Sequence, residues 1–442
     1  MKIRSKVLAV LLSACMVLGM TACGDSAKDS PSSSTGEAET DSAADEGTEA
    51  DKTGEASEAS QEASGDKIVL NFYEHSDNEK IAKQQVEEYA KLHPEVEINV
   101  SIISNDDYDD KVKVMLAGDA DIDVLWVRSG NIRQMGDDGA LMDLSDLIKA
   151  NDIDYSAYGA VGETCMDGDK IYGMCTTKSC WLLWYNKDLF DAAGMEPPTD
   201  ITWDGFADLC KELTTDELKG GLTVNWTYLI GAQSEGEYLT DDDLTYTRKY
   251  AEFLHRIWTE DESNYTLEEM SGSFDVNGTF AEGNTYMMIN GDWNFLLFPD
   301  ANPEFEWGAV PLPHFENQEV NASMGSTSAY CINSKSKNAE AAFDFIKFCT
   351  YSDEGAAIYA QNAGVAAYPS EGALEVYNQY VDVPGTEYVF AADCNLEDGP
   401  HPRYSEIKDA YSAEVQEYLL DNCTYDECME NFLARREEIL AK

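Results

Sequence analysis

The chain is poor in positively charged residues. Its 442 residues include 30 Lys and Arg against 85 Asp and Glu, which gives a formal net charge of −55 at pH 7. A surface of this charge repels nucleic acid and anionic lipid, so we exclude nucleic acid as a partner. The charge also argues weakly against phosphate or sulfate as a solute. Acidity that keeps an exposed protein soluble is the interpretation we favour.

Histidine is also scarce, with 5 residues, and no cysteine pair or Cys/His cluster has the spacing of a zinc site. The sequence therefore predicts no metal and no cofactor. The chain has 11 cysteines, and setting aside Cys15 and Cys23 leaves an odd number, which cannot pair completely. Buried, reduced thiols are the expected state, and one or two disulfides stay open as the alternative.

Long apolar runs are absent except at the amino terminus. Lys2, Arg4 and Lys6 precede an apolar run over Val7–Ala22, which is too short for a comfortable membrane span. The run ends in Met20-Thr21-Ala22-Cys23-Gly24, which resembles the lipobox of bacterial lipoproteins. The resemblance implies a signal peptide over residues 1–22 and a diacylglycerol group on Cys23.

A second stretch, Leu12-Ser13-Ala14-Cys15, also resembles a lipobox. Cleavage there would leave the apolar Met16–Ala22 on the mature end, so we prefer Cys23, and a plain secretory signal is the alternative. Residues 24–65 hold 12 acids and 2 lysines among small polar residues. Such a stretch cannot bury enough apolar surface to fold, so residues 23–65 are predicted to form a disordered acidic tether.

The folded part begins with alternating strand and helix patterns. Strands are predicted at Ile68–Tyr73, Val96–Ile102 and Ile122–Val127, and helices at Asn78–His93 and Asp107–Ala117. This order predicts a parallel sheet with helices on its faces. Ligands of such sheets bind beyond the carboxyl ends of the strands. The loops there hold Glu74, His75, Ser76, Asp77, Arg128 and Ser129.

Later segments continue the mixed pattern. They comprise a strand at Trp181–Tyr185 and helices at Thr202–Leu213, Ala339–Tyr351, Asp409–Leu420 and Tyr425–Leu440. Asn186 follows the strand and is expected to cap a helix.

Several short motifs, in order, resemble the extracellular solute-binding proteins of the maltodextrin-binding type (family 1), which are lipoproteins of ABC sugar importers. The motifs are Met115–Asp119 with Asp123–Val127, Gly139–Leu144, Ile171–Met174, Trp184–Phe190, Thr202–Asp204, Phe280–Gly283, Met287–Trp293, Val310–Pro313 and Gly325–Ser328. Each motif is weak alone, and their order from residue 67 to about residue 370 makes the assignment.

The resemblance implies an α/β, two-lobed periplasmic-binding-protein-like fold with a hinge and a ligand cleft between the lobes. Lobe 1 would comprise residues 66–175 and 328–370, and lobe 2 residues 176–327 and 371–442. The chain would cross between the lobes near Met174–Ser179, Gly325–Ser328 and Tyr368–Gly372.

Sugars offer hydroxyl groups and weakly apolar ring faces, so their sites combine carboxylates, amides and Arg with stacked aromatic rings. On these grounds and on the resemblance, the candidate ligand residues are Glu74, Asp77, Trp126, Arg128, Ser179, Trp181, Asn225, Trp226, Asp292, Trp293 and Arg403. For each tryptophan the alternative is core packing, and for Glu74 and Asp77 it is helix capping.

The expected function is therefore capture of a carbohydrate on the outer face of the bacterial cell membrane and its delivery to an ABC permease. The protein would be a lipid-anchored monomer with no catalytic residue. A surface-anchored carbohydrate-active enzyme, an adhesin and a binder of a non-sugar solute are the alternatives. No Ser/His/Asp, HExxH, P-loop or GxGxxG signature stands out in support of the enzyme.

The anchor can be tested directly. Cys23→Ser should release the protein into the medium or leave the precursor unprocessed, because the lipidated thiol is lost. Membrane fractionation with immunoblotting measures this. An effect of Cys15→Ser without an effect of Cys23→Ser would move the anchor to Cys15.

Overall fold

A computed structural model describes residues 67–441 apart from 119, 229, 234–235, 271–273, 369 and 371. The expected signal peptide, the tether and Cys23 lie outside the described residues. Among the helices in the described part, none combines the length and the apolar character needed to cross a membrane.

The first sheet has the strand order β2-β1-β3-β12-β6. Its strands are β1 (Ile68–His75), β2 (Val96–Ile103), β3 (Val124–Arg128), β12 (Ser328–Ile332) and β6 (Met174–Cys175). β1 runs parallel to β2 and β3, as the sequence predicts. β12 runs antiparallel between β3 and β6, and it belongs to the later segment that the resemblance assigned to lobe 1.

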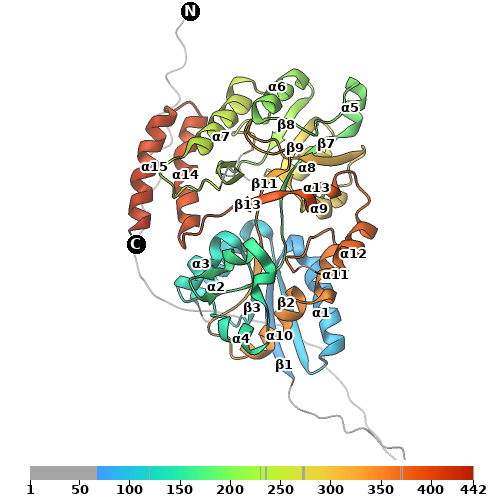
Figure 1. The fold of residues 1–442 in the computed structure, drawn as a ribbon, viewed down its shortest axis with the longest axis vertical. Helices are drawn as coiled ribbons and strands as arrows, with labels where there is room; N and C mark the ends of the chain where they lie inside the picture. The colour runs from blue at the N-terminus through green and yellow to red at the C-terminus, as the bar shows by residue number, and fades with distance from the viewer. Residues whose placement is uncertain are drawn as a thin grey trace, which may run out of the picture. The chain divides into compact units, whose positions relative to one another are not determined.

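Helices cover both faces of the first sheet (Figure 1). They are α1 (Glu79–Leu92), α2 (Tyr108–Ala117), α3 (Ser129–Asp137), α4 (Ser145–Ala150), α10 (Ala339–Thr350) and α11 (Asp353–Gln361). The same lobe holds the 3-10 helices η1 (Ser76–Asn78), η2 (Asn105–Asp107) and η3 (Tyr155–Cys165). It also holds a small hairpin of β4 (Met166–Asp167) and β5 (Lys170–Ile171). The predicted helices and strands in this part are confirmed within a residue or two at each end.

The second sheet has the order β10-β7-β9-β8. Its strands are β10 (Trp307–Pro311), β7 (Trp181–Asn186), β9 (Thr285–Gly291) and β8 (Lys219–Thr223). Side chains of β7 alternate between two apolar clusters, with Trp181, Leu183 and Tyr185 on one side and Leu182 and Trp184 on the other. Successive side chains of a strand point to opposite faces of the sheet. All of β7 is buried because both faces of the sheet are covered.

The covering elements of the second sheet are α5 (Lys187–Ala193), α6 (Trp203–Leu213), α7 (Thr245–His255), α8 (Val276–Ala281), α9 (Asn294–Ala301), α12 (Ala373–Tyr380), α13 (Thr386–Ala391), α14 (Tyr404–Leu419) and α15 (Tyr425–Leu440), with the short helices η4 (Ile230–Gln233) and η5 (Arg256–Glu260). Asn186 caps α5 as predicted, since its side chain accepts a hydrogen bond from Leu189 N. α14 begins five residues before the predicted Asp409, because the buried Tyr404 and Ile407 extend its apolar face.

Three connections join the two sheets. Residues 176–180 lead from β6 to β7, and residues 326–327 lead from β11 (Ala322–Gly325) to β12. Thr176 N and Ser179 N donate to Ser328 O and Ser326 O at 2.8 and 3.0 Å, so these two connections lie side by side. The third leads from Tyr368, a partly buried residue that packs against the core of the first lobe, to α12, whose buried Tyr377 belongs to a core cluster of the second sheet.

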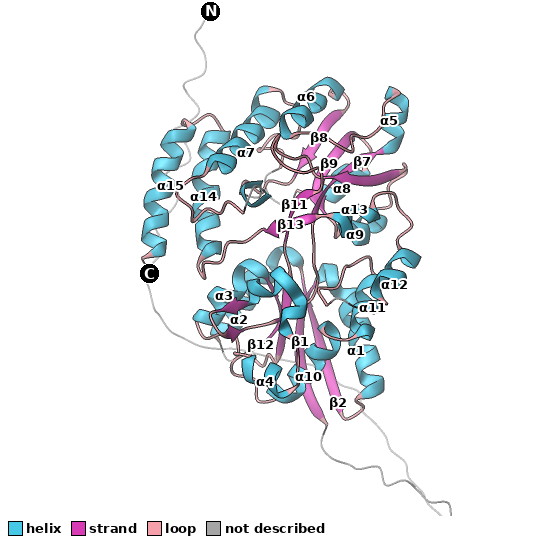
Figure 2. Ribbon diagram, viewed as in Figure 1, coloured by secondary structure: helices cyan, strands magenta, loops and turns pink. Residues whose placement is uncertain are grey.

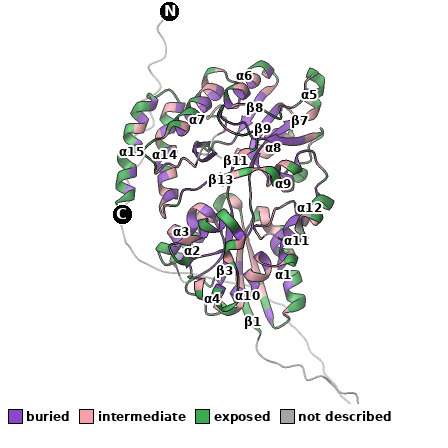
Figure 3. Ribbon diagram, viewed as in Figure 1, coloured by how far each residue is buried: buried purple, intermediate pink, exposed green. Residues whose placement is uncertain are grey.

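The structure is therefore two α/β lobes, lobe 1 built on the first sheet and lobe 2 on the second (Figures 1 and 2). Lobe 2 also holds a two-stranded parallel sheet of β11 and β13 (Asp393–Leu396). Buried residues concentrate on the strands of both sheets, and the outer helix faces are exposed (Figure 3). Within the described residues all cysteines are free, and most are buried, as expected.

Candidate functional site

A cavity of about 1220 Å³ lies between the lobes, and we call it the cleft. Its walls come from the loops after β1 and β3 in lobe 1 and from the loops after β8, β9 and β13 in lobe 2. These are carboxyl ends of strands, where open α/β sheets place their ligands. Eight candidates from the sequence line it: Asp77, Trp126, Arg128, Ser179, Asn225, Trp226, Asp292 and Trp293.

Glu74 does not reach the cleft, which corrects its predicted place there. It is fully buried beneath His75, whose backbone N–H donates to Glu74 Oε1 at 2.9 Å. Burial raises the pKa of this carboxyl to about 8, so Glu74 is protonated at neutral pH. Burial likewise lowers the pKa of His75 to about 3, and the two neighbours form a neutral pair.

Trp181 is also behind the cleft wall, because its side chain faces the core of lobe 2 and is 1% exposed. Its ring meets the rings of Trp226 and Trp293 edge to face, with centroids at 5.5 and 5.3 Å. Trp181 therefore braces two cleft residues, and the predicted direct contact with ligand is replaced by a positioning role.

Arg403 lies outside the cleft. Its guanidinium donates to Glu406 at 2.6 Å and lies 3.9 Å from Asp138 at the end of α3. These carboxylates hold Arg403 at the contact between α3 and α14, so the structure does not place it among the cleft residues where the sequence analysis expected it.

The lobe 1 wall is built around Trp126. The His75 ring packs on Trp126 with centroids 4.2 Å apart, and the Arg128 guanidinium lies 4.8 Å from its centroid. These neighbours and a 5% exposed side chain leave little ring face for a ligand. Trp126 Nε1 and His75 Nδ1 are buried without a hydrogen-bond partner among the described residues, and the nearest carboxylate oxygen to His75 Nδ1 is Asp77 Oδ2 at 4.0 Å.

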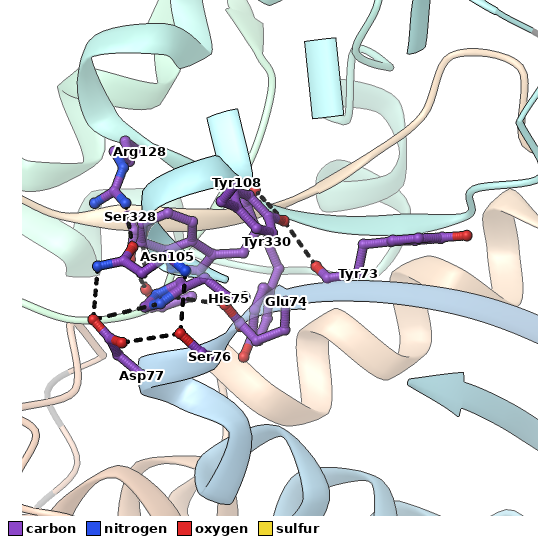
Figure 4. A network of polar contacts seen from close by, with 12 residues as sticks. Tyr73, Glu74, His75, Ser76, Asp77, Asn105, Tyr108, Arg128, Ser328 and Tyr330 are labelled. Carbon is purple, nitrogen blue, oxygen red and sulfur yellow. Dashed lines mark hydrogen bonds and ion pairs between the residues drawn. The ribbon is translucent and has the colours of Figure 1, made fainter. Parts of the chain in front are cut away.

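Asn105 links the polar groups at the edge of this wall (Figure 4). Its side chain accepts a hydrogen bond from Arg128 Nη2 and donates to Asp77 Oδ2 at 2.7 Å. Arg128 also pairs with Asp109, at 3.0 Å from Nε to Oδ2. The network fixes Arg128 and Asp77 before a ligand arrives, which lowers the entropic cost of binding.

The lobe 2 wall offers aromatic surface. Trp226 is 36% exposed, and its ring is parallel to that of Tyr228 with centroids at 6.4 Å. Trp293 is half-buried at the end of β9, and a Cβ atom on Gly291 would come within 2.0 Å of its ring. Glycine at position 291 therefore lets the indole fold back over the strand.

Buried carboxylates lie beside this aromatic surface. The backbone N–H of Asp292 donates to Cys180 O at 2.9 Å, and the backbone N–H of Cys180 donates to Asp292 Oδ1 at 3.3 Å. Glu397 Oε2 accepts from Trp181 Nε1 at 3.1 Å, and Asp398 pairs with Lys408. Burial raises the pKa of Asp292 and of Glu397 to about 7.

Sequence analysis missed several cleft residues, among them Asn105, Asn131, Tyr228, Glu397, Asp398 and Lys408. Glu397 and Asp398 reach the cleft only because β13 pairs with β11, some seventy residues earlier. Local sequence carries no signal of that pairing. His75 also lines the cleft, and the sequence analysis placed it after the first predicted strand without choosing it as a ligand residue.

No group of three or more His, Cys, Asp and Glu within the described ranges is arranged to hold a metal ion. The cleft combines carboxylate and amide acceptors, N–H donors and indole faces. That set of groups recognises hydroxyl-bearing molecules by hydrogen bonds and ring contact.

Residues 74–356 match the family described as bacterial extracellular solute-binding protein. The chain belongs to that family. Its relatives include a maltooligosaccharide ABC transporter solute-binding lipoprotein of Streptococcus pneumoniae, 24% identical over 310 residues (64% of this chain, 70% of the relative). A maltodextrin-binding protein of Bacillus subtilis is 24% identical over 330 residues, 66% of this chain and 74% of its own.

Solved structures resemble this solute-binding protein closely in fold. An ABC substrate-binding protein of Listeria monocytogenes in complex with cycloalternan superposes with a TM-score of 0.76, 25% identity, and coverage of 85% of this chain and all of the other. A solute-binding protein of Thermotoga lettingae bound to α-D-tagatose has a TM-score of 0.71, 20% identity, and 84% coverage of this chain. The two-lobed fold predicted from the sequence is confirmed.

Trp293 and Trp181 give a matched test of the aromatic wall. Trp293→Ala should cost about 2–4 kcal/mol of ligand binding with little change in melting temperature, because the ring is lost from the cleft surface. Trp181→Ala should lower the free energy of unfolding by about 3–5 kcal/mol, because it empties a buried site.

Calorimetry and thermal melts on both variants measure the two quantities. A large fall in the melting temperature of Trp293→Ala would contradict the prediction that its ring contacts ligand. Unchanged ligand affinity in a folded variant would contradict it as well.

Proposed function

We propose that this protein captures a carbohydrate by closure of its two lobes and delivers it to an ABC permease. The observation that carries the proposal is the pair of indoles, Trp226 and Trp293, braced by Trp181 beside carboxylates in a cleft between two lobes. Indole faces cover the C–H faces of sugar rings, and carboxylates accept sugar hydroxyls. Relatives whose names specify maltooligosaccharide or maltodextrin support this choice of solute.

The size of the cleft supports an oligosaccharide over a single sugar. Its volume of about 1220 Å³ exceeds the range of about 300–1,000 Å³ of pockets for drug-sized ligands. Polar residues at both walls would hold opposite sides of an extended ligand, with Asp77, Arg128 and Ser179 near lobe 1 and Asn225 and Asp292 in lobe 2.

The setting that we propose is the outer face of a bacterial cell membrane. Cys23 would carry the lipid anchor, the acidic tether of residues 23–65 would lift a monomeric body from the lipid, and residues 1–22 would be removed. Lobe 1 would comprise residues 66–175 and 328–370, and lobe 2 residues 176–327 and 371–442. The extracellular solute-binding family supports this location.

The first test separates a binder from a carbohydrate-active enzyme. Purified protein is incubated with gluco- and manno-oligosaccharides, and sugar products and melting temperature are both recorded. We expect unchanged sugar together with a higher melting temperature, since a ligand that binds only the folded state stabilises it. Shortened sugar products would instead indicate hydrolysis, which in most glycosidases is carried out by a pair of carboxylates.

The second test concerns closure. A solute that contacts both lobes favours the closed population, so small-angle scattering should give a smaller radius of gyration with a confirmed ligand than without it. A sugar that shows no binding to the protein serves as the control. An unchanged radius in the presence of saturating ligand would contradict hinge closure, and binding itself would stand.

A further inference from the structure

The walls of the cleft carry an unbalanced charge. Among the described residues that line it, eight bear a carboxylate and two, Arg128 and Lys408, bear a permanent positive charge. His75 adds none, because burial lowers its pKa to about 3. Lys178 is an exposed residue of the first connection and does not line the cleft.

Both cations are already engaged by the protein. Arg128 Nε lies 3.0 Å from Asp109 Oδ2, and Lys408 Nζ donates to Asp398 Oδ1. Lys408 is further enclosed by Tyr228, with Nζ 4.7 Å from the ring centroid. An acidic group on a solute would have to compete with these carboxylates for each cation.

Two buried carboxylates in the lobe 2 wall, Asp292 and Glu397, form no ion pair with another described residue, although the charge of Lys408 acts on Glu397. Asp292 and Glu397 are 4% and 9% exposed, and their hydrogen bonds come from Cys180 N–H and Trp181 Nε1. Solubility explains acids at the surface, and it does not explain two carboxylates enclosed beside indole rings. Charge placed near such groups acts through a low dielectric and is screened little by salt.

We infer that the cleft selects solutes by charge, accepting saccharides without an acidic group and rejecting uronic-acid saccharides of the same size and linkage. The inference rests on the proposed function and names the substrate class of that site. Asp292 and Glu397 are the determinants, because an ionised carboxylate on the solute would be held against them with no free cation to offset the repulsion.

The discrimination depends on pH with a defined sign. Burial raises the pKa of Asp292 and Glu397 to about 7 in the empty cleft. Below that pH both are mostly protonated and repel an anion weakly, and above it both are ionised. The affinity for an acidic saccharide relative to a neutral one should therefore fall as pH rises from about 5.5 to about 8.5.

Other charged or titratable groups surround the two carboxylates. Asp398, Lys408 and Tyr228 lie around Glu397, and Cys180, Cys394 and Tyr377 lie around Asp292. Lys408 stays protonated because Asp398 raises its pKa against the effect of burial.

The experiment uses three forms of one ligand. The neutral gluco- or manno-oligosaccharide that binds most tightly is oxidised at C6 to the uronic acid, and part of that product is converted to the uncharged uronamide. The amide keeps the shape of the acid and lacks its charge. We expect the acid to bind at least about tenfold more weakly than the amide at pH 8.5, and the gap to narrow at pH 5.5.

Variants assign the effect to the cleft. Asp292→Asn and Glu397→Gln keep hydrogen-bonding atoms and should each lower the ratio of the dissociation constant of the acid to that of the amide at pH 8.5. Asp110→Asn removes the same charge from an exposed position on α2 outside the cleft and should leave the ratio unchanged, because solvent and salt screen it.

Equal affinity for acid and amide at pH 8.5 would overturn the inference and leave the proposed function standing. A ratio that moves as much in Asp110→Asn as in Glu397→Gln would also overturn it, since the effect would then come from overall charge. If no neutral saccharide binds at all, the proposed function fails and the inference fails with it.

Discussion

Trp181 links three parts of the molecule: the core of lobe 2, the first connection between the lobes and the wall of the cleft. It is the first residue of β7, directly after the connection from lobe 1, and its ring is sealed in the core of lobe 2. The same ring holds Trp226 and Trp293 edge to face, and its Nε1 donates to Glu397. One buried indole thus fixes two aromatic residues and one acid of the cleft.

The connections explain how a rigid wall of this kind can belong to a moving lobe. Residues 176–179 hydrogen bond to Ser326 and Ser328 of the second connection and, through Lys178 N to Val365 O at 2.9 Å, to a segment near the third. The connections are short, and hinge motions of two-lobed proteins are absorbed by a few residues of such connections. In the closure that we propose, the geometry inside each lobe would be preserved and the distance between the two walls would change.

The sequence predicted the first sheet well because its elements are local. Strands such as Val96–Ile102 alternate cleanly, and helices stop at Gly or Pro, so pattern alone defines them. Eight of eleven candidates line the cleft because strand ends and motif positions are also local properties.

The failures have a shared cause. Trp181 and Glu74 sit one layer behind the wall, and period-two alternation cannot say which face of a strand meets ligand when both faces are buried. Glu397 and Asp398 depend on the pairing of β13 with β11, and Arg403 was assigned from its loop without knowledge of Glu406 and Asp138. The pairing of β13 with β11 and the approach of Arg403 to Asp138 are long-range contacts, which the local sequence does not encode.

Asp398 is a charged residue of the cleft that is bonded to both lobes. Its Oδ2 accepts from Ser129 Oγ of lobe 1 at 2.6 Å, while Lys408 of lobe 2 holds the other oxygen. Nearby, Arg133 Nη1 of α3 donates to Gly399 O at 3.1 Å. Separating the lobes here would break the bonds from Ser129 and Arg133 and leave Asp398 to water and Lys408. Since Glu397 is its neighbour in the chain, an acid that lines the cleft lies next to a residue that bonds across the two lobes.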